Sequence, residues 1–545
     1  MSIQRKVLPY LPSLIPGAVS AVVLCILAVT LLLQLTTLPE FDKLSLGARF
    51  GRTLFWTSLQ ASLSTIGSII VGVALAWALY HRARFPGRSL LIALLSSALV
   101  LPTLVVVLGL VSVLGRSGWL NDLLNTLFSF RLTPFIYGLD GIVIAHCYFN
   151  ASFAARALLT RLNSIPEEQM KLSASLGLSA WQRLRLVEWP YLSTSIPALA
   201  TTIFLLCFTS FAIVLTLGGS PKYNTLEVSI FEAIKLDYDL GRALGLALIQ
   251  LAICALLVIA TSRTKLLDHL TSTPADKQPI PADARITVAI QWVVIAVFSL
   301  FFLLPLLAVV IDGLTADWTS LLTDSLFIRA TLTSLIIATI SAVCALSISF
   351  MLAQTYTTLA TSQRLGNLRV APIFLRLLNF SATLYLAVPA LVLGFSFFLL
   401  ARNFGGPNQF WATAAIVTAN VLMVLPFALV TLAPAAVKAA NRYDRLTASL
   451  GLRGYRRFTI VESSLMRSEL VYVASIAFCM SLGDLGVIAL FGSQDFATLP
   501  WLLYQKMGAY RTTEAAGIAA FMLIITLLVF LAAPRLLVKN HAATR

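Results

Sequence analysis

Asp484, His146 and Asn420 are polar side chains that lie inside long apolar stretches of the sequence. A charged group at the centre of a membrane costs about 2.5–3.5 kcal/mol on insertion scales, so such residues mark a transport pathway by default. The carboxylate of Asp484 could attract a cation, or it could hydrogen-bond backbone opened by Gly483 and Gly486. His146 and Asn420 occupy matching positions in two halves of the chain that repeat one another. They are either candidate pathway residues or interhelical hydrogen-bond partners.

The sequence lacks the usual patterns of covalent or metal chemistry. Its six cysteines lie in apolar stretches without a CxxC pair, and its four histidines form no cluster with metal-ligand spacing. No loop gathers a nucleophile, a base and metal ligands, which disfavours a membrane enzyme. The phosphate cradle Gly-x-x-x-x-Gly-Lys-Ser/Thr is also absent. We therefore expect no catalytic residue, no metal site and no cofactor bound by this chain, so that any ATP and Mg would be bound by a separate subunit.

The elements that must position these residues are membrane-spanning helices. Hydrophobic residues make up 59% of the chain and charged residues 11%, against about 25% charged residues in ordinary soluble domains. A helix needs about 20 apolar residues to cross the hydrocarbon. Runs of this length predict twelve spans in an all-α integral membrane protein, at 14–38, 57–79, 89–114, 138–160, 196–217, 240–261, 287–311, 331–354, 379–401, 411–433, 470–491 and 514–533.

The basic residues predict the orientation of these spans. Most of the 39 Lys and Arg residues fall in segments on one side, which the positive-inside rule assigns to the cytoplasm together with both termini. This distribution explains the net charge of +16 without nucleic-acid binding. The first apolar run exceeds the 7–15 apolar residues typical of a signal peptide, so we expect it to remain as the first span.

A polar motif inside two of the cytoplasmic segments indicates an internal repeat. Leu172-Ser-Ala-Ser-Leu-Gly-Leu178 returns in the second half of the chain as Leu446-Thr-Ala-Ser-Leu-Gly-Leu452. The two copies are 274 residues apart, and we call two residues with this separation equivalent, as Gly177 and Gly451 are. We expect a first half at 1–261 with a motif loop at 161–195, a cytoplasmic linker at 262–286, and a second half at 287–545 with a motif loop at 434–469. Because each half has an even number of spans, the two halves should be parallel repeats about an axis along the membrane normal.

Each motif loop is expected to fold as helix, glycine turn and helix. Ser164-Ile-Pro-Glu167 and Ser179-Ala-Trp-Gln182 have the spacing of capping boxes, and the second of these helices should end near Pro190. Asn441 resembles a helix cap in the second copy. Gly177 and Gly451 suit left-handed turns. The alternative is a pair of amphipathic helices that merely lie on the membrane surface.

The spacing around these glycines resembles a known permease signature. Nine residues separate Gly177 from Val187-Glu-Trp-Pro190, and nine separate Gly451 from Val461-Glu-Ser-Ser464. The inner-membrane permeases of binding-protein-dependent ABC importers carry Glu-Ala-Ala, three residues, Gly, nine residues and Ile-x-Leu-Pro in a cytoplasmic loop. Here the opening triplet is degenerate in both copies, and the second copy lacks the closing proline.

Scattered matches over nearly the full length are similar to the fused two-half thiamine (vitamin B1) permeases of Gram-negative bacteria. They include Tyr137-Gly-Leu-Asp-Gly-Ile142, Leu215-Thr-Leu-Gly-Gly219 and Ser481-Leu-Gly-Asp-Leu-Gly-Val-Ile-Ala-Leu-Phe-Gly492. Related iron(III) permeases share the fused architecture, so iron(III) import is the alternative. A twelve-span secondary transporter is a further alternative, although such carriers often place their polar motif between spans two and three.

The resemblance implies a type I importer permease in the bacterial inner membrane that carries thiamine and its phosphate esters by alternating access. Two copies of an ABC ATPase would dock on the motif loops, and a periplasmic binding protein would deliver substrate. No nucleic acid is involved, and membrane lipid surrounds the chain. The implied ATPase-coupling residues are Glu167, Glu168, Gly177, Val187, Glu188, Pro190, Asp444, Gly451, Val461 and Glu462.

Overall fold

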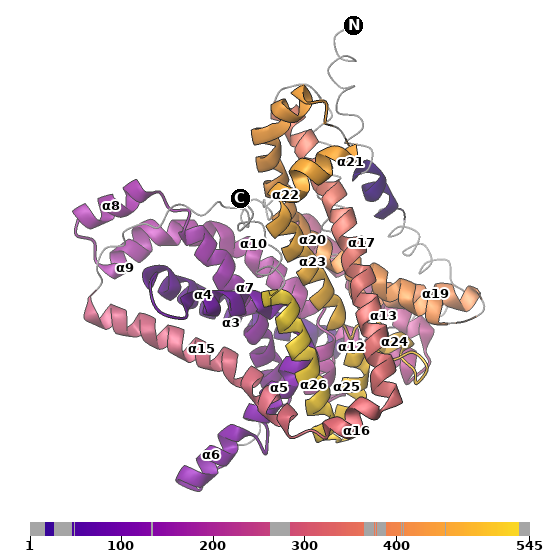
Figure 1. Ribbon diagram of the computed structural model, residues 1–545. Coiled ribbons are helices and arrows are strands. Elements are labelled where there is room, and N and C mark those ends of the chain that lie inside the picture. Colours follow the sequence, from indigo (N-terminus) through magenta and orange to yellow (C-terminus); the bar gives the residue numbers. More distant parts are fainter. Residues whose placement is uncertain are drawn as a thin grey trace.

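The computed structural model describes residues 17–24, 26, 46–47, 49–131, 135–261, 284–364, 375, 378, 388–404, 406, 408–452 and 454–532. Within these ranges the regular elements are all helices (Figure 1). Those of the first half are α3 Phe50–His81, α4 Arg88–Ser97, η2 Ala98–Val100, α5 Thr103–Leu114, α6 Trp119–Phe128, α7 Leu139–Leu162, α8 Glu167–Ser175, α9 Ala180–Arg183, η3 Leu184–Glu188, α10 Trp189–Phe208, α11 Ala212–Leu217, α12 Leu226–Lys235 and α13 Leu240–Thr261.

The second half has a similar order of elements. It comprises α15 Arg285–Leu314, α16 Trp318–Thr323, α17 Ser325–Arg364, α19 Ala390–Asn403, α20 Gln409–Ser449, α21 Gly454–Arg457, η4 Phe458–Glu462, α22 Ser463–Leu465, α23 Arg467–Leu482, α24 Ile488–Phe491, α25 Leu499–Gly508, α26 Thr512–Leu527 and η5 Leu528–Ala532. The first predicted span, 14–38, and the predicted linker, 262–286, lie largely outside the described residues.

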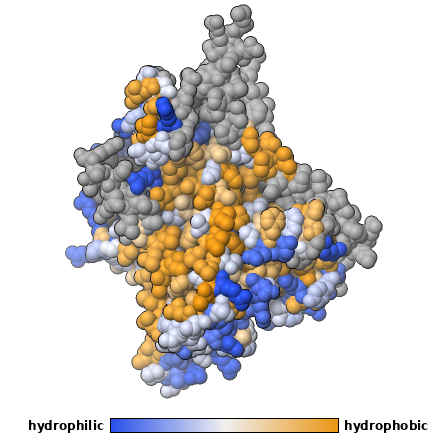
Figure 2. Space-filling model, turned by 45° about the vertical axis from the view of Figure 1, so that its right-hand side comes forward, coloured by the Kyte–Doolittle hydropathy of each residue, from blue (hydrophilic) through white to orange (hydrophobic). Residues whose placement is uncertain are grey.

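The fold is that of an all-α, multi-pass integral membrane protein. Among the described residues nine helices are long and apolar enough to cross a membrane, and a bent pair at 458–482 gives a tenth. The shorter apolar helix Arg88–Val100 lies at the start of the predicted span 89–114, which Thr103–Phe128 continues, and the shorter apolar helix Ala390–Arg402 lies at the end of one further predicted span, 379–401. Apolar side chains cover the middle of one face, and hydrophilic ones gather toward its lower end (Figure 2). These elements fit the predicted architecture of about twelve spans in two six-span repeats.

The same helix pairs form the centre of each half. Helix α3 packs along α7 in the first half, and α17 packs along α20 in the second. Gly72 permits the close approach of α3 and α7, since a Cβ there would lie 2.6 Å from the Cβ of Ala154. The fifth span of each half, α10 or α23, then packs against α3 or α17 respectively.

A polar cap also recurs in both halves. The backbone N–H of Leu226, at the start of α12, donates to Thr57 Oγ1 of α3 over 3.0 Å. The backbone N–H of Leu499, at the start of α25, donates to Ser334 Oγ of α17 over 2.8 Å. The first amides of a helix have no partner within the helix, and lipid offers none. Each cap therefore fixes a short helix against the second span of its own half.

Two predicted spans end earlier than the apolar pattern indicates. The predicted span at 196–217 divides into α10, which begins at Trp189, and the separate helix α11. The predicted span at 470–491 ends at Leu482, and a short irregular segment precedes α24. Hydropathy records only the apolar character of a run. It cannot detect a break whose backbone groups are satisfied by neighbouring helices or line a cavity.

Candidate functional site

Both motif loops contain the predicted left-handed glycine turn. Gly177 has φ +63° and Gly451 has φ +65°. The N–H of Leu178 bonds the carbonyl of Ser173 over 3.1 Å, and the N–H of Leu452 bonds that of Thr447 over 2.9 Å. This is the hydrogen bond of a Schellman cap, which satisfies a carbonyl at the end of a helix. No atom lies within 4 Å of a Cβ added at either glycine, so only the backbone conformation requires glycine there.

The helix caps differ from the predictions in two places. Ser179 and Gln182 form the expected capping box. Ser164 does not cap α8, because its hydroxyl donates to the carbonyl of Arg161 and Pro166 occupies the cap position. Asn441 is not a cap either, since α20 continues past it to Ser449. The first loop has Pro166 to break its helix, whereas the equivalent residue of the second loop is Ala440.

A turn of π-helix joins each loop to the fifth span of its half. These turns are η3 in the first half and η4 in the second. Arg183 Nε bonds Glu188 Oε1 over 3.2 Å across η3. Arg457 Nε bonds Glu462 Oε1 over 2.7 Å across η4. The predicted helix end near Pro190 is wrong, because Pro190 lies in the first turn of α10, where a missing N–H costs little.

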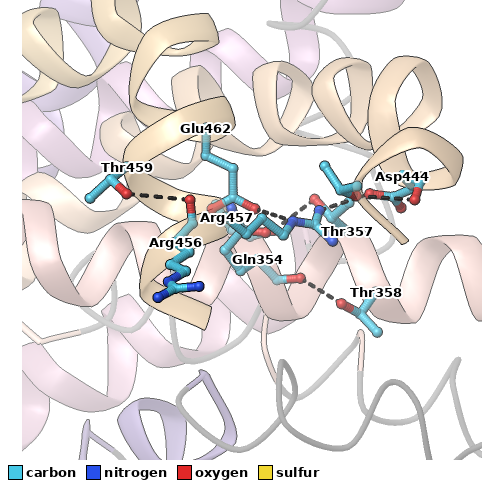
Figure 3. A network of polar contacts seen from close by, with 10 residues as sticks. Gln354, Thr357, Thr358, Asp444, Arg456, Arg457, Thr459 and Glu462 are labelled. Carbon is cyan, nitrogen blue, oxygen red and sulfur yellow. Dashed lines mark hydrogen bonds and ion pairs between the residues drawn. The ribbon is translucent and has the colours of Figure 1, made fainter. Parts of the chain in front are cut away.

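The two arginine–glutamate pairs lie in different surroundings. Glu188 is fully buried and also bonds His81 Nε2 of α3 over 2.9 Å. Thr355 occupies the position equivalent to His81 in the second half. There Arg457 bonds Asp444 over 2.8 Å instead, and its side chain is 33% exposed. Figure 3 shows Arg457 between Glu462 and Asp444, with polar side chains of α17 alongside.

Both loops expose apolar side chains at matching positions. Leu172, Leu176 and Leu186 in the first loop are equivalent to Leu446, Leu450 and Ile460 in the second. Each of the six is between 54% and 65% exposed. Apolar groups that gather on an exposed surface indicate contact with a partner. Sequence reasoning missed these residues, although apolar residues at equivalent positions of two charged loops were a usable signal.

The remaining predicted coupling residues surround these turns. Glu167 and Glu168 lie in the first turn of α8, where the helix dipole favours carboxylates. Glu167 bonds Lys171 over 2.6 Å and raises the pKa of that ammonium group. Val187 and Val461 are half-buried in the two π-helical turns. The predicted set therefore lies in and around two structurally equivalent loops, with Glu188 and Glu462 buried beneath them.

Two cavities lie between the halves. The outer cavity, farther from the motif loops, is lined by His146, Asn150, Glu227, Met423, Met480 and Asp484, among others. The inner cavity, nearer the loops, is lined by Arg156, Thr160, Ser468, Glu469 and Tyr472, among others. Leu99, Val100 and Phe427 line both cavities. These three side chains form an apolar partition between the two spaces.

One residue of the partition, Phe427, contacts its own equivalent in the first half. Phe153 and Phe427 are related by the same shift as Gly177 and Gly451. Their ring centroids are 6.4 Å apart, with the planes at 83°. A residue meets its own equivalent across a twofold only beside the axis, so the pseudo-twofold axis passes close to the two phenyl rings. Arg156 Nη1 also bonds the hydroxyl of Tyr472 over 2.7 Å, joining the two halves at the inner cavity.

The three predicted pathway residues have different surroundings. His146 and Asp484 line the outer cavity. Asn420 is not among the residues that line it, and its amide donates to Ser481 Oγ over 2.7 Å. Asp484 lies in the break after α23 rather than within a span, and its Oδ1 accepts the N–H of Gly486 over 2.9 Å. In the part of the chain that the structure describes, no three His, Cys, Asp or Glu side chains form a metal-binding group.

Comparison with known proteins identifies the class. Residues 68–270 match the model of the binding-protein-dependent transport system inner membrane component. The thiamine transport system permease protein ThiP of Escherichia coli (strain K12) is 39% identical over 490 residues, covering 90% of this chain and 89% of that protein. ThiP of Salmonella typhimurium is 40% identical over 483 residues (88% and 87%), and ThiP of Brucella abortus (strain 2308) is 37% identical over 495 residues (89% and 87%).

The fold and the two loops therefore define a membrane permease of the binding-protein-dependent transport class. Within that class, the chain belongs to the family of thiamine transport system permease proteins. The match extends over both halves of the chain, as expected for fused repeats.

The unequal burial of the two arginine–glutamate pairs predicts unequal losses of stability. Glu188→Ala leaves the buried guanidinium of Arg183 without its carboxylate, which typically costs about 3–5 kcal/mol. Glu462→Ala should cost about 1 kcal/mol, because Arg457 is partly exposed and retains Asp444. Thermal unfolding of the purified variants in detergent measures the difference. Equal shifts in midpoint for the two variants would contradict this prediction.

The partition predicts that Phe427→Ala opens a path between the cavities. An apolar constriction excludes water and ions, so its loss should raise passive leak of a small solute through the chain in liposomes about tenfold. Phe204→Ala is the matched control, because Phe204 stacks on Phe208 and lines neither cavity. Equal leak through the two variants would show that Phe427 does not close the path.

Proposed function

We propose that this chain is the membrane-spanning subunit of an ATP-driven, binding-protein-dependent importer that carries thiamine and its phosphate esters into the cytoplasm. The observation that carries the coupling mechanism is the pair of equivalent loops, each with a left-handed glycine, a π-helical turn and exposed apolar side chains. The substrate is proposed from the relatives, which are named thiamine transport system permease proteins.

The two loops would each receive one copy of an ABC ATPase subunit. Leu172, Leu176 and Leu186, with their equivalents, supply apolar contacts on an otherwise charged surface. The buried Arg183–Glu188 pair ties the first loop to α10, and the Arg457–Glu462 pair ties the second to α23. A displacement of either loop would therefore move the fifth span of the same half. ATP and Mg would be bound by the ATPase, and this chain would contribute no catalytic residue.

Alternating access would follow from movement of the halves about the partition. Leu99, Val100 and Phe427 line both the outer and the inner cavity and lie between them. Approach of the two loops would rotate the halves, open one cavity and close the other. In this proposal the chain is in the bacterial inner membrane, its termini and loops are cytoplasmic, and a periplasmic binding protein delivers substrate to the outer cavity.

Reconstitution tests the proposed function. The chain, its cognate ATPase and its binding protein are inserted into liposomes, and uptake of labelled thiamine is measured after ATP addition. We expect thiamine to accumulate only with ATP, and iron(III) not to accumulate. If iron(III) accumulated and thiamine did not, the substrate would be iron(III) rather than thiamine. Thiamine uptake without ATP or ATPase would overturn the importer mechanism.

The glycine turns predict a second outcome. Gly177→Val or Gly451→Val should leave the chain inserted but reduce ATPase association and uptake severely, because the left-handed conformation costs residues with a Cβ about 1–2 kcal/mol and suits β-branched ones worst. Gly177→Asn is the matched control, since asparagine adopts this conformation more readily. Pull-down of the ATPase and uptake at equal membrane abundance are the measurements. Normal ATPase association and normal uptake in both valine variants would show that the loops are ordinary surface helices.

A further inference from the structure

Three polar side chains that line the outer cavity, the buried Glu227 and His146 and the partly buried Asp484, share one bonding pattern. Glu227 Oε1 accepts a hydrogen bond from Gln250 Nε2 over 2.9 Å, and Asp484 Oδ1 accepts one from the N–H of Gly486 over 2.9 Å. His146 Nδ1 lies 3.1 Å from Ser64 Oγ. In each residue the second polar atom, Oε2, Oδ2 or Nε2, is buried and has no partner in the protein.

Such atoms require an explanation, because nearly all buried polar groups in folded proteins have a partner. Glu227 is 1% exposed and His146 is 2% exposed, so bulk water does not satisfy them. Both residues and Asp484 line the same cavity. One polar atom of each residue is thus held by the protein, and the other is buried at the cavity wall without a protein partner.

The fold holds the two carboxyl groups firmly on opposite halves. Glu227 is the second residue of α12, whose first amide is capped by Thr57 and whose N-terminal dipole favours a carboxylate. Asp484 lies in the break after α23. Gly483 lets this break approach the first half closely, since a Cβ there would lie 2.8 Å from the Cα of Pro102. A ligand held by both groups would therefore span the interface between the halves.

The charge of the outer cavity selects the class of ligand. Its lining contains the carboxyl groups of Glu227 and Asp484 and, among the described residues, no Lys or Arg, although the chain as a whole carries a net charge of +16. Phe149, Phe211 and Phe427 also line it and offer aromatic faces to a delocalised cation. Most of the other lining side chains are apolar, so the cavity offers too few oxygen atoms for a cation such as Ca²⁺, which needs 6–8 oxygen ligands. The acidic and aromatic lining therefore favours an organic cation over a metal ion.

We propose that Glu227 and Asp484, one from each half, form a binding site for the cationic group of an organic substrate in the outer cavity. The inference rests on the proposed function and adds a site to it. His146 lines the same cavity and would supply a further hydrogen-bonding group to the same ligand. Sequence reasoning missed Glu227, because it lies between two predicted spans rather than inside one.

Binding to the permease–ATPase complex in lipid nanodiscs, without the binding protein, tests this site. Equilibrium dialysis with radiolabelled thiamine should show saturable binding to the wild type. Glu227→Gln and Asp484→Asn should each weaken the affinity about tenfold, and the double variant should abolish measurable binding. Glu232→Gln is the matched control, because Glu232 lies on the same helix α12 but does not line the cavity. A neutral analogue with a reduced thiazolium ring should not compete.

Several results would overturn the site. Absence of saturable thiamine binding to the wild type would overturn it. So would an unchanged affinity for thiamine in both Glu227→Gln and Asp484→Asn, or an equal loss of affinity in the control Glu232→Gln. Competition by the neutral analogue at the same concentration would show that charge does not select the ligand. Measurement of ATP-dependent thiamine uptake in liposomes distinguishes failure of the binding-site proposal from failure of the proposed function. Uptake without charge-dependent binding would refute the binding site alone. Binding without uptake would refute the proposed transport function.

Discussion

The mechanical account depends on the ion pair that bridges a π-helical turn in each half. Arg183–Glu188 and Arg457–Glu462 join residues at the same spacing and connect a motif loop to the span that follows it. Without this bridge a loop could move while its span stayed in place, because a π-turn is a local irregularity within a helix. The first bridge is buried and includes His81, whereas the second is partly exposed and includes Asp444. The two halves are thus equivalent in geometry but unequal in surroundings.

The repeat also positions the proposed pathway. Phe153 and Phe427 meet beside the pseudo-twofold axis, and Phe427 lies between the outer and inner cavities. Apolar side chains suit this position, because they exclude water without leaving a polar group unpaired in a dry contact. The carboxyl groups of Glu227 and Asp484 line the outer cavity, and the Arg156–Tyr472 contact lies at the inner cavity. A cation would therefore pass from an acidic space, through an apolar partition, toward the motif loops.

The sequence predicted the class of fold and the two loops, because hydropathy and a repeated motif are local signals. The turns at Gly177 and Gly451 followed from residue type alone. The break after Leu482, the burial of Glu227 and the role of Asn420 depend on packing between distant helices, which local pattern does not record. The cap predicted at Ser164 failed for a local reason, since Pro166 took the cap position and the serine hydroxyl bonded the preceding turn.

The central claim is that the two loops move toward each other and carry their halves with them. Ser175 and Ser449 are equivalent, exposed residues at the tips of the loops, and each can be replaced by cysteine and spin-labelled after the native cysteines are removed. Pulsed electron paramagnetic resonance on the reconstituted complex then measures the distance between the labels. We predict a shorter distance with a non-hydrolysable ATP analogue than without nucleotide. An unchanged distance in labelled complexes that still take up thiamine would contradict the account.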